Sequence, residues 1–206
     1  MLGLLAPTDP NWAKVACANL DETLIDHAHC ELKAATNALS LVARYPDELD
    51  LVLALSALAA EELEHFRIVI GHLEERGLRL GAPPVDDYAA ALRKASTALP
   101  QRHVERFILI DRLLVGALIE ARSCERFRLL IGALADASER DQKLRAFYEE
   151  LFAAEAKHFR TYVDLAKLAA RDQASLVDAR LELLAEQEAR IVRGLTTAGP
   201  RPSIHG

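Results

Sequence analysis

The sequence contains few cysteines, and it lacks both a leader-like start and a long uncharged apolar run. Its 206 residues include three cysteines, Cys17, Cys30 and Cys124, with no C-x-x-C pair among them. An odd set of this kind argues against a disulfide framework and indicates a reducing compartment. No basic segment followed by an apolar stretch opens the chain, and no run of about 18 apolar residues is free of charge. We therefore expect a soluble, cytoplasmic protein with no membrane partner.

The sequence also lacks an excess of positive charge. Its 25 Lys and Arg are outnumbered by 31 Asp and Glu, which gives a net charge of -6. Such a chain has no overall attraction for polyanions, so contact with a nucleic acid would need a local basic patch. Its hydrophobic content of 51% is sufficient to bury a substantial core, and this excludes a largely disordered chain.

Glycine and proline are confined to a few places, and the long stretches between them are rich in Ala, Leu, Glu and Arg. This composition predicts helices, and we find no strand-like alternation. The expected helices span about 11–44 with a break near the start, 47–76, 86–97, 102–133, 138–171 and 174–193. We expect Gly77 to cap the second of them and Ser138 to cap the fifth.

Four of these segments form two helical hairpins joined by a longer crossover. This order is typical of an all-α, ferritin-like four-helix bundle with a long crossover and additional helices. We expect one domain over residues 1–193, with a bundle core over about 20–170 and an extra C-terminal helix over about 174–193. Residues 194–206 are expected to form a mobile tail.

The motif E-x-x-H-F-R occurs twice, beginning at Glu62 and again 93 positions later at Glu155. Residues three apart share a helix face, so Glu62 pairs with His65, and Glu155 with His158. Apolar neighbours at helical spacing place both pairs toward the core. Glu61 and Glu64 also lie near His65, but the second copy has Ala and Lys at their positions, so the comparison selects Glu62. A single such pair is commonly a packed histidine beside an acid, whereas two inward-facing copies favour a metal site.

A two-metal carboxylate site needs one further glutamate from each of the other two bundle helices. Glu31 lies in a nearly charge-free stripe, whereas Asp26 has charged neighbours and is expected on a solvated face. In the other helix, a shift of 93 residues from Glu31 favours Glu125. The neighbours favour Glu120, because Glu125 is flanked by arginines that can pair with it at the surface. His27, one turn before Glu31, is either a group that orients this ligand or a packed histidine.

Four carboxylates and two neutral imidazoles balance the charge of two divalent cations. Oxygen ligands with one imidazole for each metal suit iron, or less readily manganese. The same ligands serve oxygen activation, iron oxidation or storage, and peroxide reduction, so the metal site alone does not select the reaction.

Four segments of the chain resemble the MiaE family of tRNA hydroxylases: DHAHCELKAA (26–35), AAEELEHF (59–66), LLVGALIEARSCERF (113–127) and EAKHFRTYVDLA (155–166). The resemblance implies a ferritin-like, non-haem di-iron monooxygenase. It implies hydroxylation of the isopentenyl side chain of 2-methylthio-N6-isopentenyladenosine beside the tRNA anticodon. It also implies iron ligation by Glu31, Glu62, His65, Glu120, Glu155 and His158. The implied partners are tRNA, molecular oxygen and an external electron donor, since no flavin or nicotinamide fingerprint is visible.

Arg122, Arg126 and Lys157 are expected on the outer faces of the site-bearing helices, where they could contact tRNA phosphates. Small residues near the site, Gly116 and Ala117 among them, could leave room for a prenyl group. The alternative function is iron oxidation or storage of the ferritin or bacterioferritin kind, which predicts a hollow multi-subunit shell. For the hydroxylase we expect a monomer or small oligomer.

Overall fold

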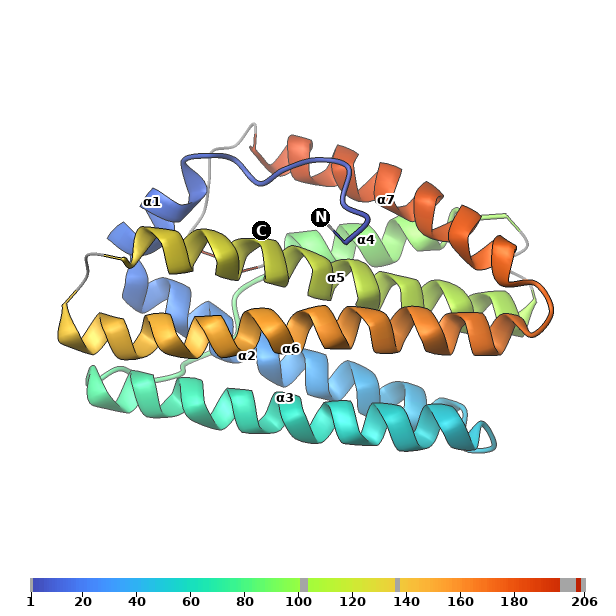
Figure 1. Ribbon diagram of the computed structural model, residues 1–206, viewed down its shortest axis with the longest axis horizontal. Coiled ribbons are helices and arrows are strands. Elements are labelled where there is room, and N and C mark those ends of the chain that lie inside the picture. The colour runs from blue at the N-terminus through green and yellow to red at the C-terminus, as the bar shows by residue number, and fades with distance from the viewer. Residues whose placement is uncertain (1, 101–103, 136–137, 197–202, 205–206) are drawn as a thin grey trace. The chain divides into compact units, whose positions relative to one another are not determined.

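The computed structural model describes residues 2–100, 104–135, 138–196 and 203–204. These residues form seven helices and no strand, which confirms the all-α class expected from the sequence. The helices are α1 (Trp12–Ala18), α2 (Leu20–Arg44), α3 (Leu49–Glu75), α4 (Asp87–Ser96), α5 (Glu105–Ala133), α6 (Glu139–Ala170) and α7 (Ala174–Thr196) (Figure 1). Within the described ranges, no helix is long and apolar enough to cross a membrane.

The chain divides into two compact units, which we describe separately. Unit 1 consists of Met1–Ala13, Asp86–Arg201 and His205–Gly206, and unit 2 consists of Lys14–Val85 and Pro202–Ile204. The single domain expected over residues 1–193 stays a prediction. Residues 197–202 and 205–206 of the expected mobile tail lie outside the described residues, whereas α7 continues to Thr196 and Ile204 is buried.

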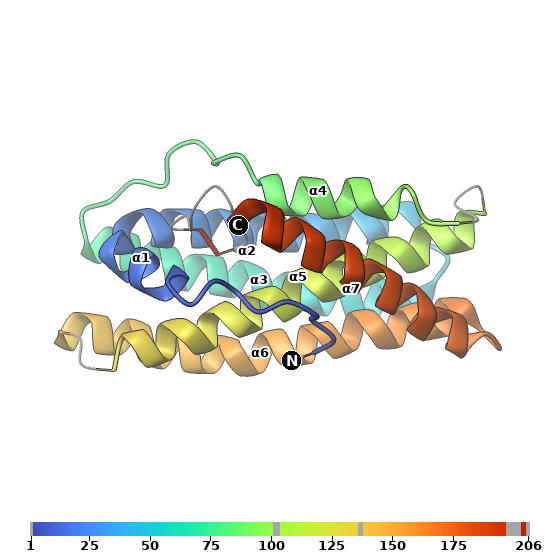
Figure 2. The same cartoon turned by 90° about the horizontal axis from the view of Figure 1, so that it is seen from above.

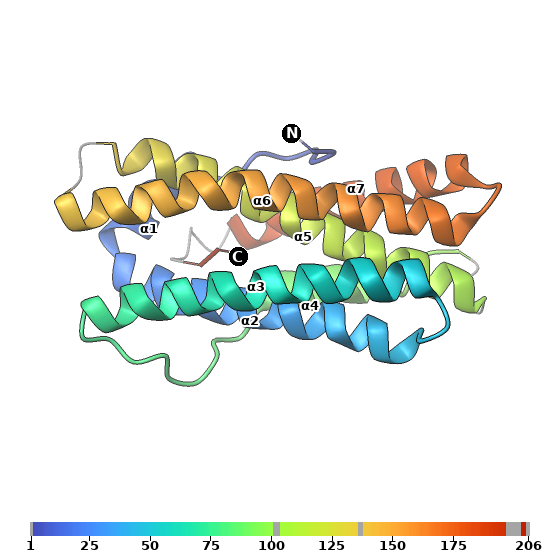
Figure 3. The ribbon, with the colours of Figure 1, turned by 60° about the horizontal axis from the view of Figure 1, so that its bottom comes forward.

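Unit 2 is built on the antiparallel pair α2 and α3, which are joined by a short connection over residues 45–48 (Figure 3). Pro46 ends α2 because the residue before a proline is disfavoured in helical conformation. The expected break in the first helix falls at Asn19, between α1 and α2. Apolar side chains at helical spacing, such as Leu24, Ala28 and Ala35, are buried.

Gly77 ends α3 in the way the sequence predicts. Its φ of +70° is in the left-handed region that favours glycine. The backbone N–H of Gly77 donates to the carbonyl of Glu74, and that of Leu78 donates to the carbonyl of Leu73, each at 2.9 Å. Together these bonds form a Schellman motif, which satisfies carbonyls at the end of α3.

Unit 1 contains the second antiparallel pair, α5 and α6, with α4 and α7 packed against α5 (Figure 2). α4 begins after Asp86, whose Oδ1 accepts a hydrogen bond from the Ala89 backbone at 2.9 Å. α6 begins after Ser138, whose Oγ accepts from the Asp141 backbone at 3.3 Å. The predicted cap at Ser138 is therefore confirmed.

A network of buried charges connects α5 to α4, α7 and the N-terminal segment of unit 1. Nε and Nη2 of Arg122 donate to Oε1 of Glu188 on α7, at 2.9 and 2.7 Å. Tyr88 on α4 donates to the same oxygen at 3.0 Å. Nη1 of Arg122 donates to Glu125 and to the Thr8 hydroxyl, the latter at 3.1 Å. The guanidinium therefore holds α7 and the N-terminal segment on α5 directly, and α4 joins them through the bond from Tyr88 to Glu188.

Candidate metal centre

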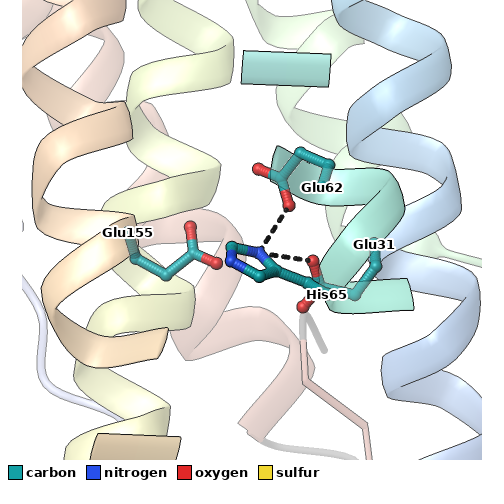
Figure 4. Close-up of side chains that lie close together, drawn as sticks. All are labelled: Glu31, Glu62, His65 and Glu155. Atoms are coloured by element: carbon teal, nitrogen blue, oxygen red, sulfur yellow. Dashed lines mark hydrogen bonds and ion pairs between the residues drawn. The ribbon is translucent and has the colours of Figure 1, made fainter. Parts of the chain in front are cut away.

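Unit 2 brings together a glutamate from α2 with the glutamate and histidine of the first E-x-x-H motif on α3. Nδ1 of His65 lies 3.4 Å from Oε2 of Glu62 and 3.6 Å from Oε2 of Glu31, as the dashed lines of Figure 4 show. Both separations exceed the roughly 2.7–3.2 Å of an ordinary N–H···O hydrogen bond. Both carboxylates are buried and the imidazole is partly buried. The three side chains converge without making short bonds to one another, as ligands of a shared cation would.

His27 contacts the candidate ligand of α2 from one turn away. Its Nε2 lies 2.6 Å from Oε1 of Glu31, and its side chain is fully buried. Burial opposes the ionisation of Glu31, but the hydrogen bond with His27 and the longer contact with His65 outweigh it and hold the pKa of Glu31 well below its ordinary value. Burial also disfavours a charged His65, yet its contacts with the Glu31 and Glu62 carboxylates raise the pKa of His65 to about 9. Of the two roles expected for His27, the structure supports the orientation of Glu31.

Unit 1 carries a matching set from α5 and α6. Ligand atoms of Glu120, Glu155 and His158 all lie within 4.8 Å of one another, and all three side chains are buried. Nδ1 of His158 lies 3.7 Å from Oε2 of Glu155. In both units the histidine therefore turns Nδ1 toward the glutamate three residues before it. The duplication seen in the sequence is thus matched by local geometry in each unit.

The structure favours Glu120 over Glu125, the alternative that the sequence left open. The Glu125 carboxylate accepts hydrogen bonds from Arg122 and, at 2.6 Å, from the Thr8 hydroxyl. With Arg126 and Glu188, these residues form a buried set of two positive and two negative charges. Such a set is balanced without a metal ion. Glu120 instead lies beside Glu155 and His158.

The sequence predicts that Arg122 and Arg126 lie on outer helix faces, and this prediction is wrong. Arg122 is fully buried in its network with Glu188, and Arg126 is 6% exposed, with its guanidinium 5.0 Å from the centre of the Trp12 ring. Buried in this way, neither guanidinium is available to a tRNA phosphate. Lys157 is exposed on α6, as expected.

Two further expectations fail for reasons of packing. Asp26 is not on a solvated face: its Oδ2 is buried and accepts hydrogen bonds from the Cys30 thiol at 3.6 Å and the Ile204 backbone at 2.7 Å. Gly116 does not leave room for a prenyl group, because a Cβ placed there would lie 2.9 Å from the Tyr162 ring. Tyr162 follows Glu155 by two helical turns on α6, and its ring fills the space at this glycine.

The donor set of each unit fits an iron or manganese ion. Each unit presents two carboxylates and one imidazole, the hard oxygen and nitrogen ligands that these metals accept. With a neutral imidazole, each set carries a charge of about -2, which one divalent cation would balance. Buried carboxylates without a compensating cation are costly, so both sets favour a bound metal.

Comparisons with known proteins relate this chain to one family of tRNA hydroxylases. The family model described as tRNA-(MS[2]IO[6]A)-hydroxylase (MiaE) matches residues 2–205. A tRNA 2-(methylsulfanyl)-N(6)-isopentenyladenosine(37) hydroxylase of Pseudomonas putida is 43% identical over 160 residues, which cover 78% of this chain and 73% of the relative. The enzyme of the same name from Salmonella typhimurium is 31% identical, with 95% of this chain and 89% of the relative covered.

One solved structure is similar along almost the whole chain. It is described as protein 43 with aldehyde deformylating oxygenase activity from Synechococcus, and it is 40% identical with a TM-score of 0.84. The similarity covers 98% of this chain and 95% of that one, and it confirms the all-α, ferritin-like fold class predicted from the sequence. From the family match over residues 2–205 and the two curated relatives, it follows that this chain belongs to the MiaE family.

Proposed function

We propose that this protein hydroxylates the isopentenyl side chain of 2-methylthio-N6-isopentenyladenosine in the tRNA anticodon loop. Two iron ions would be held by Glu31, Glu62, His65, Glu120, Glu155 and His158. The observation that carries the proposal is the paired donor set, two carboxylates and an imidazole in each unit, in a member of the MiaE family. Both curated relatives are named as hydroxylases of this nucleoside.

The bound metal supplies oxidation chemistry: one atom of O2 enters a C–H bond of the prenyl group, and the other leaves as water with two electrons and two protons. The protein's own side chains prepare the site for this reaction. His27 holds Oε1 of Glu31 by a 2.6 Å contact and leaves Oε2 toward His65. Burial of the carboxylates and of His158 keeps bulk water away from them, which strengthens their attraction for a cation.

The reaction also requires partners outside the chain. The two electrons come from an external donor, and tRNA is the substrate, so we place the reaction in the cytoplasm. Lys157 is exposed on the same helix as Glu155 and His158, and we propose it as a contact for a tRNA phosphate. The protein acts as a monomer or small oligomer.

Nucleoside analysis of tRNA from cells with and without this protein tests the proposed reaction. Loss of the hydroxylated prenyl adenosine, with accumulation of its unhydroxylated precursor, is the expected result. Complementation with Glu62→Gln should fail, whereas Glu64→Gln should restore the modification, because Glu64 is exposed and paired with Arg67. An unchanged nucleoside profile would contradict hydroxylation of tRNA and favour iron oxidation or storage.

Aldehyde deformylation is a second candidate reaction, favoured by 40% identity to the Synechococcus protein described with that activity. It would use the same donor set with an aldehyde in place of tRNA. Purified iron-loaded protein with a reductant and oxygen should be offered both substrates in parallel. Formate release from an aldehyde, with prenylated tRNA left unmodified, would select this second reaction.

A further inference from the structure

The two donor sets differ in the residue that precedes the ligand glutamate by one helical turn. In α2 this residue is His27, which contacts Glu31 at 2.6 Å. In α5 the corresponding residue, four positions before Glu120, is Gly116. Glycine has no side chain that could orient the Glu120 carboxylate, so α5 has no counterpart of His27 at this position.

The Tyr162 ring fills the place that Gly116 leaves open. A Cβ on Gly116 would lie 2.9 Å from both Cε1 and Cζ of Tyr162, closer than real side chains pack. Cζ is the carbon that carries the hydroxyl group, so it is the polar end of the ring that lies against the α5 backbone at this turn. Tyr162 is only 1% exposed and lies one turn after His158 on α6.

The direction of helical side chains brings Glu120 to the same place. Side chains in an α-helix tilt toward the N-terminus and lie over the turn before their own Cα. The Glu120 side chain therefore leans back toward the turn that begins at Gly116, where the polar end of Tyr162 lies. Glu120 and Tyr162 are both buried, and buried polar groups in proteins are nearly always hydrogen-bonded.

We propose that the Tyr162 hydroxyl donates a hydrogen bond to the Glu120 carboxylate and positions it, as His27 positions Glu31. This inference rests on the metal ligands of the proposed function. At the position that matches Tyr162 in the first motif, α3 has the apolar Val69. Each unit thus has one polar group that positions its glutamate. In unit 2 it is an imidazole from the glutamate's own helix, and in unit 1 it is a phenol from the neighbouring helix. A neutral phenol and an imidazole differ as partners, so the two iron ions would be chemically inequivalent.

The variant Tyr162→Phe tests this assignment, with Tyr148→Phe as a matched control. Tyr148 is also fully buried on α6, and its ring stacks on Phe127 with 5.2 Å between centroids. Loss of an outer hydrogen bond to a metal ligand weakens metal binding by about 10- to 100-fold. Anaerobic ferrous titration should show one of two sites weakened by at least about tenfold in Y162F and neither site weakened in Y148F. Mössbauer spectra of 57Fe-loaded protein should show two quadrupole doublets in the wild type, with one of them shifted in Y162F.

A second measurement on metal-free protein separates this inference from the metal site itself. The Tm of Y162F, Glu120→Gln and the double variant is measured with a chelator present. A hydrogen bond between the two side chains predicts that their Tm shifts do not add, whereas independent residues give additive shifts. Additive shifts together with unchanged iron affinity in Y162F would overturn the assignment. If the wild type bound no iron, the proposed function would fail, and non-additive Tm shifts would still support the hydrogen bond.

Discussion

His65 illustrates how single residues tune the candidate metal centre. Its raised pKa, about 9 against an ordinary 6.5, means that the metal-free protein holds a proton on this imidazole at neutral pH. Since the folded-state pKa is the higher one, the shift stabilises the metal-free fold fully below about pH 6.5. That stabilisation is lost as the pH rises through about 9. A metal ion must displace the same proton.

Metal affinity should therefore rise with pH between about 6.5 and 9 and level off above that range. Titration of the metal-free protein with Mn2+, which resists oxidation over this range, measures the dependence. We expect a loss of about tenfold in affinity for each pH unit below 9 at the affected site, from the release of one proton. A His72→Gln variant is the control, because His72 lies outside the donor set. A pH-independent affinity between pH 6.5 and 9 would contradict a protonated His65.

At the scale of helices, α5 supplies both a candidate metal ligand and the centre of a buried charge network, from residues only two positions apart. Glu120 faces the donor set of unit 1, and Arg122 faces the network that ties α5 to α4, α7 and the N-terminal segment. Neighbouring positions on a helix point about 100° apart, so residues two apart face nearly opposite sides. The placement of Glu120 therefore depends on contacts made on the other side of its own helix.

The variant Arg122→Met should strongly destabilise the protein. It would leave Glu188 and Glu125 buried without their cation, and removing one partner of a buried ion pair typically costs about 3–5 kcal/mol. Urea unfolding followed by circular dichroism measures the change. Arg128→Met on the same helix is the matched control and should stay within about 0.5 kcal/mol of the wild type, since Arg128 is exposed. Equal stabilities for the two variants would show that the buried network contributes little.

The helices themselves were largely predictable, because local signals determine where they begin and end. Gly77, Ser138 and Asp86 act within a few residues of themselves, and each lies where the sequence places a helix end. The burial of Arg122 was not predictable in the same way. Its partners Glu188 and Thr8 are 66 and 114 residues away in the sequence, and a charged side chain without a visible local partner looks like a surface residue. The same limit applies to Tyr162, since the open space at Gly116 exists only once α5 and α6 are packed.

For the molecule as a whole, the acidic net charge of -6 means that tRNA must be bound through a local surface. With Arg122 and Arg126 buried, Lys157 and the neighbouring Arg160 are the exposed basic pair near the second E-x-x-H motif. Residues three apart lie on one helix face, so both charges can meet the same stretch of phosphates.

Reversing this pair, Lys157→Glu with Arg160→Glu, should weaken tRNA binding and reduce its dependence on salt. Each lost phosphate contact lowers the slope of log affinity against log salt concentration by about one. Lys143→Glu is the control, because Lys143 is an exposed lysine of α6 about four turns before Lys157. Filter binding of prenylated tRNA at several salt concentrations measures both quantities. If the double variant kept the wild-type affinity for tRNA and the wild-type salt dependence, tRNA would have to bind a surface that does not include Lys157 and Arg160.

The two units contribute one donor set each, and the proposed reaction requires both. Glu31→Gln in unit 2 and Glu120→Gln in unit 1 each replace one carboxylate with a neutral amide that binds iron poorly. If each set worked alone, either variant would retain about half of the hydroxylation, because the other set would be intact. If both irons act in one reaction, either variant should lose more than about 100-fold in kcat/KM. This loss exceeds the one expected when only a residue that hydrogen-bonds a metal ligand is replaced. Hydroxylation of prenylated tRNA by iron-loaded protein measures the difference. The exposed acids Glu64 and Glu150 provide a matched Glu→Gln control in each unit. Half-activity in either ligand variant would contradict a reaction that requires both irons.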